Sequence, residues 1–296
     1  MDNLRGATFM VLAMLGFAIE DSFIKLMGDA LPVGQILFMI GVGGAVVFGA
    51  VVLSQKRALF EPAMLTLPVF CRGGGEIFGT ICFVSAIVYT PLSTASAILQ
   101  ATPLVVTLGA ALFLGESVGW RRWAAISVGF IGVLMIIRPG LEGFSPLSLF
   151  ALGGVFGLAV RDIATRKIPS NLSTMQLSFL GFLVIIPAGL FLMMITGNSF
   201  APLDARLWLL MIASISIGVF AYYGIVAAMR IGEVSFVSPF RYSRLIFAMI
   251  IGIAFFGERP DFATILGATV IVASGIYTVL REQTLRRKMA AKPSQV

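Results

Sequence analysis

Ten apolar segments, each about the length that crosses a lipid bilayer, make up most of this 296-residue chain. A membrane-spanning helix needs roughly 20 mainly apolar residues to cross about 30 Å of hydrocarbon. Breaks at charged residues and Gly/Pro clusters place the segments near 5–27, 33–53, 67–89, 92–114, 122–138, 146–166, 174–196, 206–229, 233–256 and 262–281. The connections are too short for a soluble domain. We therefore predict an all-α integral membrane protein with ten transmembrane helices.

The composition excludes several other classes of protein. Apolar residues make up 58% of the chain and charged residues 12%, whereas soluble domains carry about 25% charged residues. The runs 104–114 and 126–137 do not alternate in hydropathy, which argues against a β-barrel. Histidine is absent, and Cys71 and Cys82 lie eleven positions apart on one apolar segment. We therefore expect no catalytic residues, no metal site, no disulfide and no cofactor.

The basic residues predict the orientation in the membrane. The first segment runs into Glu20 and Asp21 rather than into a small-residue cleavage site, so we interpret it as a retained helix. With the N-terminus inside, thirteen Lys and Arg residues fall on the cytoplasmic side and three on the other. The net charge of +7 therefore suits membrane orientation better than nucleic-acid binding. We expect a multi-pass protein of the cell (inner) membrane with both termini cytoplasmic.

The sequence repeats itself at an offset of 141–142 residues. Eleven identities keep this register, and they include Gly16, Ala18, Asp21, Gln35 and Phe38, which recur as Gly157, Ala159, Asp162, Gln176 and Phe179. The predicted units are 1–141 and 146–281, followed by a basic cytoplasmic tail, 282–296. Because five crossings per unit is an odd number, the units must be inverted, as in many transporters.

Short motifs near the end of each half carry a family resemblance. Leu-Gly-Glu at 114–116 and Gly-Val-Leu at 132–134 resemble the closing helix pair of an EamA domain. Phe-Gly-Glu-Arg-Pro at 256–260 and Gly-Ile-Tyr at 275–277 resemble its second copy. Two such domains in tandem are typical of the drug/metabolite transporter superfamily. The resemblance implies secondary transport of a small organic solute through a cavity between the halves.

Glu116 and Glu258 each follow a glycine in the turn before the last helix of their half. We interpret both as structural, with the carboxylate near the N-terminus of the next helix, where the helix dipole favours it.

Two arginines lie deep in the ninth segment, where a charge costs about 2.5–3.5 kcal/mol without a partner. Arg241 and Arg244 are three residues apart and so share one helix face. Pro239 precedes them, and Pro103 interrupts the fourth segment in the corresponding region. The arginines could donate to a substrate carboxylate, phosphate or carbonyl, or form structural ion pairs with Glu76 or Asp162. The candidate substrate-binding residues are Arg241, Arg244, Tyr242, Tyr222 and Gln100.

A second set of charged residues is assigned to gating or coupling. Arg72 and Glu76 are spaced for an i,i+4 pair around the Gly73-Gly74-Gly75 run, which allows close helix approach or a local break. Asp21 and Asp162 are repeat equivalents, whereas the equivalents Glu20 and Arg161 have opposite charges. A desolvated carboxylate among them could carry a coupling proton, or the acids could pair with basic neighbours or reach water. Lys25 is expected to extend to the outer interface.

These observations predict a secondary transporter that works by alternating access. For the substrate we favour an amino acid or a flavin-like vitamin such as riboflavin. An anionic nucleotide or sugar-phosphate derivative is the alternative, followed by a lipid-flippase function. A membrane-embedded enzyme is disfavoured because no acid–base pair, nucleophile or metal cluster lies at the right depth. The expected partners are the substrate and the lipid bilayer, and a monomer and a homodimer both remain open.

Overall fold

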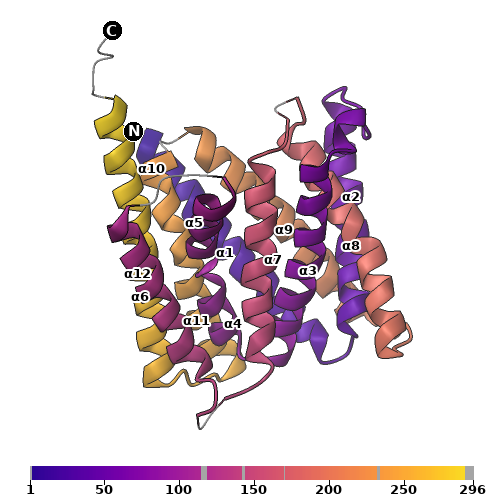
Figure 1. The fold of residues 1–296 in the computed structure, drawn as a ribbon. Helices are drawn as coiled ribbons and strands as arrows, with labels where there is room; N and C mark the ends of the chain where they lie inside the picture. Colours follow the sequence, from indigo (N-terminus) through magenta and orange to yellow (C-terminus); the bar gives the residue numbers. More distant parts are fainter. Residues whose placement is uncertain (1, 115–118, 142–143, 170, 232–233, 291–296) are drawn as a thin grey trace.

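The computed structural model describes residues 2–114, 119–141, 144–169, 171–231 and 234–290, and all regular secondary structure in these ranges is helical (Figure 1). Nine helices of this part are long and apolar enough to cross a membrane, and a shorter apolar helix covers Trp123–Ile137. The prediction of an all-α integral membrane protein with ten spans is confirmed. The first described helix begins, and the last one ends, at the same end of the molecule (Figure 1).

Eight spans are single helices. They are α1 (Asp2–Gly28), α2 (Val33–Ser54), α3 (Leu67–Tyr89), α6 (Trp120–Ile137), α7 (Ser148–Thr165), α8 (Thr174–Thr196), α9 (Ala205–Ile231) and α12 (Phe262–Ala290). A short 3₁₀ turn, η1 (Pro62–Met64), precedes α3. Because α12 runs to Ala290, much of the predicted basic tail continues the last helix.

The fourth and ninth spans are interrupted, as Pro103 and Pro239 led us to expect. The fourth consists of α4 (Leu92–Leu99) and α5 (Thr102–Phe113), and the ninth of α10 (Val234–Val237), a 3₁₀ segment η2 (Ser238–Tyr242) and α11 (Ser243–Phe256). Each proline removes a backbone donor where the helix changes. Interrupted helices in corresponding positions of inverted repeats mark the binding region of many transporters.

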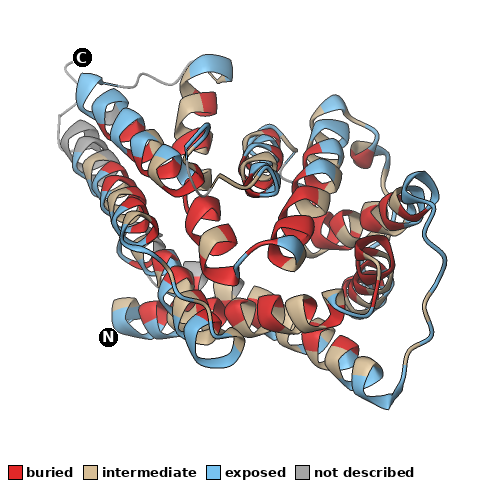
Figure 2. Cartoon of the chain, turned by 90° about the horizontal axis from the view of Figure 1, so that it is seen from below, coloured by how far each residue is buried: buried red, intermediate tan, exposed pale blue. Residues whose placement is uncertain are grey.

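The two halves interleave. The largest packing contacts join α3 to α7, α1 to α9, α2 to α8 and α6 to α12, so each pair takes one helix from either half. Exchanging the halves converts the α1–α9 pair into α7–α3 and maps the other two pairs onto themselves. This is the pattern of an inverted repeat about a two-fold axis. Buried residues accordingly lie where helices face one another, and many exposed ones lie on the periphery (Figure 2).

Glycines allow the backbones of α3 and α7 to touch. A Cβ atom at Gly157 would lie 2.4 Å from the Cα of Gly79, and one at Gly75 would lie 2.6 Å from the amide nitrogen of Arg161. A Cβ at Gly74, in contrast, would meet nothing within 4 Å. The glycine run of α3 therefore serves close approach through Gly75, and the helix continues through it without a break.

We expect Gly157→Ala to lower the free energy of unfolding by about 1–3 kcal/mol, because the added methyl group meets backbone that cannot move aside. Gly74→Ala is the matched control on the other helix of the pair. It fills open space and replaces a poor helix former, so its stability should be unchanged or higher by up to about 1 kcal/mol. Thermal unfolding in detergent compares the two variants. Equal effects would show that the glycine contact does not limit helix approach.

Two buried glutamines, repeat equivalents of each other, connect the halves. Gln35 on α2 donates to the carbonyl of Ala201 and accepts from its amide, both at 2.8 Å. Gln176 on α8 donates to the carbonyl of Ala58 at 2.8 Å and to the Glu61 carboxylate at 2.7 Å. Each glutamine thus binds a loop of the opposite half. The sequence marked both positions as repeated but gave them no role.

Glu258 has a different position from the one we predicted. Its carboxylate accepts from the amides of Leu92 and Ser93, at 2.5 and 2.9 Å, and from the Ser93 hydroxyl at 2.6 Å. It therefore caps α4 in the other half, not the next helix. Gly257 has the left-handed conformation expected of the turn, with φ 63°. Glu116, its repeat equivalent, lies outside the described residues, as does Gly115 before it.

Lys25 also differs from its prediction. Its ammonium group donates to the carbonyls of Ile87 at 3.1 Å and Thr90 at 2.6 Å. These carbonyls lie at the C-terminal end of α3, where backbone acceptors lack helical partners. Lys25 therefore ties α1 to α3 and does not simply extend to the interface.

Candidate substrate-binding site

Four of the charged residues form one ionic group between α3 and α7. Arg72 and Glu76 pair at 3.7 Å, as their spacing predicted. Arg161 approaches Glu76 at 3.2 Å and Asp162 at 2.9 Å. The side chains are partly accessible, from 12% for Glu76 to 38% for Asp162. Glu76 is thus shared by two arginines, which satisfies its charge at low exposure.

A second ionic pair joins α1 to α11. Arg244 contacts both carboxylate oxygens of Asp21 through Nη2, at 2.6 and 2.8 Å, and one of them through Nε at 3.1 Å. Its guanidinium also lies over the rings of Phe17 and Phe83, 5.2 and 5.3 Å from their centroids. The Asp21 side chain is only 3% exposed. Arg244 thus has a structural partner, but that partner is Asp21 and neither Glu76 nor Asp162.

Arg241 lies between the two groups but belongs to neither. Its side chain is solvent-accessible, and it forms no hydrogen bond or ion pair with any residue that the structure describes. Its electrostatic neighbours are Asp162 and Arg161 on α7 and Arg244 on α11. A lipid-facing side chain would not have these interior neighbours. Arg241 is therefore an exposed residue whose guanidinium lies among charged groups of α7 and α11 and has no ion-pair partner among the described residues.

Glu20 is the corresponding unpaired carboxylate. It is the repeat equivalent of Arg161, and Gly218 is the equivalent of Glu76. The α3–α7 pair holds the Arg161–Glu76 ion pair. The equivalent α1–α9 pair packs the Glu20 carboxylate against Gly218, whose missing Cβ would lie 2.6 Å from Oε1. Glu20 has no hydrogen bond or ion pair among the described residues. Its charged neighbours are Asp21 and Arg244.

The remaining predicted binding residues are Tyr222, Gln100 and Tyr242, and their surroundings differ. The Tyr222 hydroxyl contacts the Ser178 hydroxyl at 2.5 Å, and Tyr222 is an electrostatic neighbour of Arg72. Gln100 lies at the α4–α5 break, and its buried amide nitrogen has no hydrogen-bond partner within the described ranges. Tyr242, its equivalent at an offset of 142, also has an unpartnered buried hydroxyl, but this atom lies against Gly275 of α12.

Sequence reasoning missed two parts of this site. The stacking of Arg244 on Phe17 and Phe83 could not be predicted from spacing in the sequence, because the three residues lie on three different helices. Gly218 could have been found, since the repeat register aligns it with Glu76. Where the first half has Glu76, the second half has Gly218. The missing side chain leaves space for Glu20 of the first half.

Comparison with known proteins identifies the family. The EamA-like transporter family matches residues 4–138 and again 146–280. The chain belongs to that family. It is a small-metabolite transporter of the drug/metabolite transporter superfamily and not an enzyme.

Characterised relatives match this EamA-like transporter over nearly its whole length. It is 25% identical over 289 residues to an S-adenosylmethionine uptake transporter of Rickettsia prowazekii, covering 98% of this chain and 96% of the relative. It is 29% identical over 295 residues to a riboflavin transporter of Vibrio cholerae, covering 96% of each chain. A pseudopaline exporter of Pseudomonas aeruginosa is 29% identical over 284 residues, covering 93% of this chain and 96% of the exporter.

A solved crystal structure has the same fold. It superposes with a TM-score of 0.61 at 19% identity, covering 94% of this chain and 97% of the other. The ten-helix arrangement is thus shared with an experimental structure.

Proposed function

We propose that this transporter carries a small polar metabolite, preferably an amino acid or an amino-acid-bearing compound, and that Arg241 binds its carboxylate. The observation that carries this proposal is that Arg241 is exposed and that its guanidinium has no ion-pair partner in the part of the chain that the structure describes. Arg161 and Arg244, its basic neighbours, are both neutralised by acidic residues. A substrate carboxylate would provide the partner that Arg241 lacks, through charge-assisted hydrogen bonds.

The unpaired Glu20 supports a substrate that carries both charges. A carboxylate without a partner suits an ammonium group or another cationic centre, so the two free charges together suit a zwitterion. S-Adenosylmethionine, which one relative takes up, is an amino acid with a cationic sulfur centre. Riboflavin, named for another relative, would use Arg241 as a donor to carbonyl oxygens. A nucleotide or sugar phosphate would use Arg241 but would be repelled by Glu20.

Glu20 also supports proton coupling by this transporter. Asp21, the other candidate on α1, is already bound by Arg244 at several points. Glu20 has no such cation, so a proton can neutralise it when the substrate is absent. The inverted halves would then rock about this region to expose it to each side in turn. We further propose an inner-membrane location with both termini cytoplasmic, on the distribution of Lys and Arg.

The test is uptake into liposomes that contain the purified protein. Labelled S-adenosylmethionine, other amino acids, riboflavin, a nucleotide and a sugar phosphate are screened with and without a proton gradient. We expect saturable uptake of either a zwitterionic amino acid or riboflavin. Unlabelled compounds of the same chemical class as the transported substrate should compete with it, and the other compounds should not. Saturable uptake of the nucleotide or sugar phosphate alone would replace the proposal with its alternative. Dependence on the gradient, lost in Glu20→Gln, would support coupling at Glu20.

A further inference from the structure

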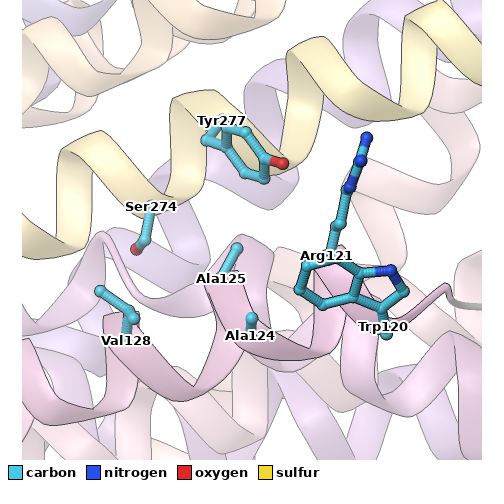
Figure 3. Close-up of a pocket in the computed structure, with 7 residues that line it drawn as sticks. All are labelled: Trp120, Arg121, Ala124, Ala125, Val128, Ser274 and Tyr277. Atoms are coloured by element: carbon cyan, nitrogen blue, oxygen red, sulfur yellow. The ribbon is translucent and has the colours of Figure 1, made fainter.

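A groove opens between α6 and α12 toward the end of the molecule where α6 begins. The two helices touch through glycines, since a Cβ at Gly132 would lie 2.8 Å from the carbonyl oxygen of Gly267. Between this contact and the start of α6, the two helices line a cavity of about 310 Å³. Figure 3 shows its lining residues: Trp120, Arg121, Ala124, Ala125, Val128, Ser274 and Tyr277.

The opposite end of the same helix pair is closed. Arg138, which follows α6, forms an ion pair with Asp261, which also accepts from the Thr264 amide at 2.8 Å. The Thr264 amide and the Arg138 guanidinium hold the pKa of Asp261 below its ordinary value of 3.8, so the carboxylate stays charged at neutral pH. The repeat equivalents of Arg138 and Asp261 are Leu280 and Gly119, which cannot form this pair. The groove end of the helix pair therefore lacks the cross-link that the Arg138–Asp261 ion pair provides at the other end.

The mouth of the groove combines a cation with aromatic rings. The Arg121 guanidinium lies 5.5 Å from the centroid of the Trp120 ring and has no ion-pair partner within the described ranges. Trp120 is 74% exposed and Tyr277 45% exposed. Trp and Tyr favour the level of the lipid headgroups, and arginine binds phosphate groups through several parallel donors. None of the seven lining residues is acidic.

Below the mouth the groove is apolar. Ala124, Ala125 and Val128 form its wall on α6, and exposed Val128 continues toward the glycine contact. These side chains are small and apolar, so an acyl chain of a bilayer lipid can lie along them. A phosphate at one end and an acyl chain along the groove are the two parts of a phospholipid.

We propose that this groove binds an anionic phospholipid, with its phosphate on Arg121 and an acyl chain along Ala124, Ala125 and Val128. A second copy of the chain is a poorer occupant, because a two-fold contact through this face would bring the two Arg121 side chains together. Inorganic phosphate shares the charge but would leave the apolar groove empty. The site is separate from the candidate substrate site and does not depend on the proposed function.

Native mass spectrometry and thermal unfolding in a neutral detergent test the site. Phosphatidylglycerol should be retained and should raise the melting temperature, whereas phosphatidylcholine should do so less and inorganic phosphate not at all. Arg121→Gln should weaken phosphatidylglycerol binding about fivefold, the effect of one basic residue near the membrane surface. Trp120→Ala should weaken both lipids.

The matched control is Arg259→Gln, an exposed arginine in the turn at the closed end of the same helix pair. It should bind phosphatidylglycerol like the wild type. Equal retention of both lipids by the wild type, or unchanged phosphatidylglycerol binding by Arg121→Gln, would overturn the proposal. So would cross-linking through Trp120 or Tyr277 to a second copy in the presence of the lipid.

Discussion

Arg241→Gln is expected to reduce uptake about 10- to 100-fold while the protein remains folded. The substitution removes a charged donor whose hydrogen bonds to a carboxylate contribute about 1.5–3 kcal/mol. Stability should not fall, because Arg241 has no ion pair among the described residues to lose. Initial uptake rates over a range of substrate concentrations, with melting temperatures measured in parallel, check both parts. The loss should appear chiefly as a higher KM.

Arg206→Gln is the control for this experiment. Arg206 is exposed at the start of α9, away from the charged groups, and its loss should leave uptake unchanged. Arg241→Lys should recover part of the activity, because lysine keeps the charge but not the planar donor geometry. Full uptake by Arg241→Gln would rule out Arg241 as the substrate contact.

Asp21→Asn should cause the largest loss of stability, about 3–5 kcal/mol. It leaves Arg244 without its counter-charge in a site where the Asp21 side chain is 3% exposed, and an uncompensated buried charge is costly. Arg244→Gln should be destabilising for the same reason. The double variant Asp21→Asn/Arg244→Gln should be more stable than either single variant, because both charges are then absent. Thermal unfolding of the four proteins gives the coupling between the two residues.

Asp29→Asn serves as the comparison for the carboxylate change. Asp29 is exposed just beyond α1, so its replacement should alter stability by no more than about 0.5 kcal/mol. If the stability loss of the double variant equals the sum of the losses of the two single variants, Asp21 and Arg244 act independently, contrary to the geometry.

The sequence by itself determined the spans, the inverted repeat and the family. A membrane-crossing segment is recognised from the length of one apolar run, because its backbone must satisfy its own hydrogen bonds in lipid. The repeat is equally linear, since Asp21 and Asp162 keep their register along the chain. Local rules also predicted the Arg72–Glu76 pair and the interruptions near Pro103 and Pro239.

Only the tertiary structure decided which charged residues remain free. By sequence, Arg241 and Arg244 are simply two arginines on one helix face. In the structure Arg244 is neutralised by Asp21, 223 positions earlier, whereas Arg241 has no such partner among the residues described. The same holds for Glu258, whose partners belong to α4. Such partners are brought together by the packing of helices that are distant in the sequence. The periodicity of a sequence shows which residues share a helix face, but it does not show which other helix that face contacts.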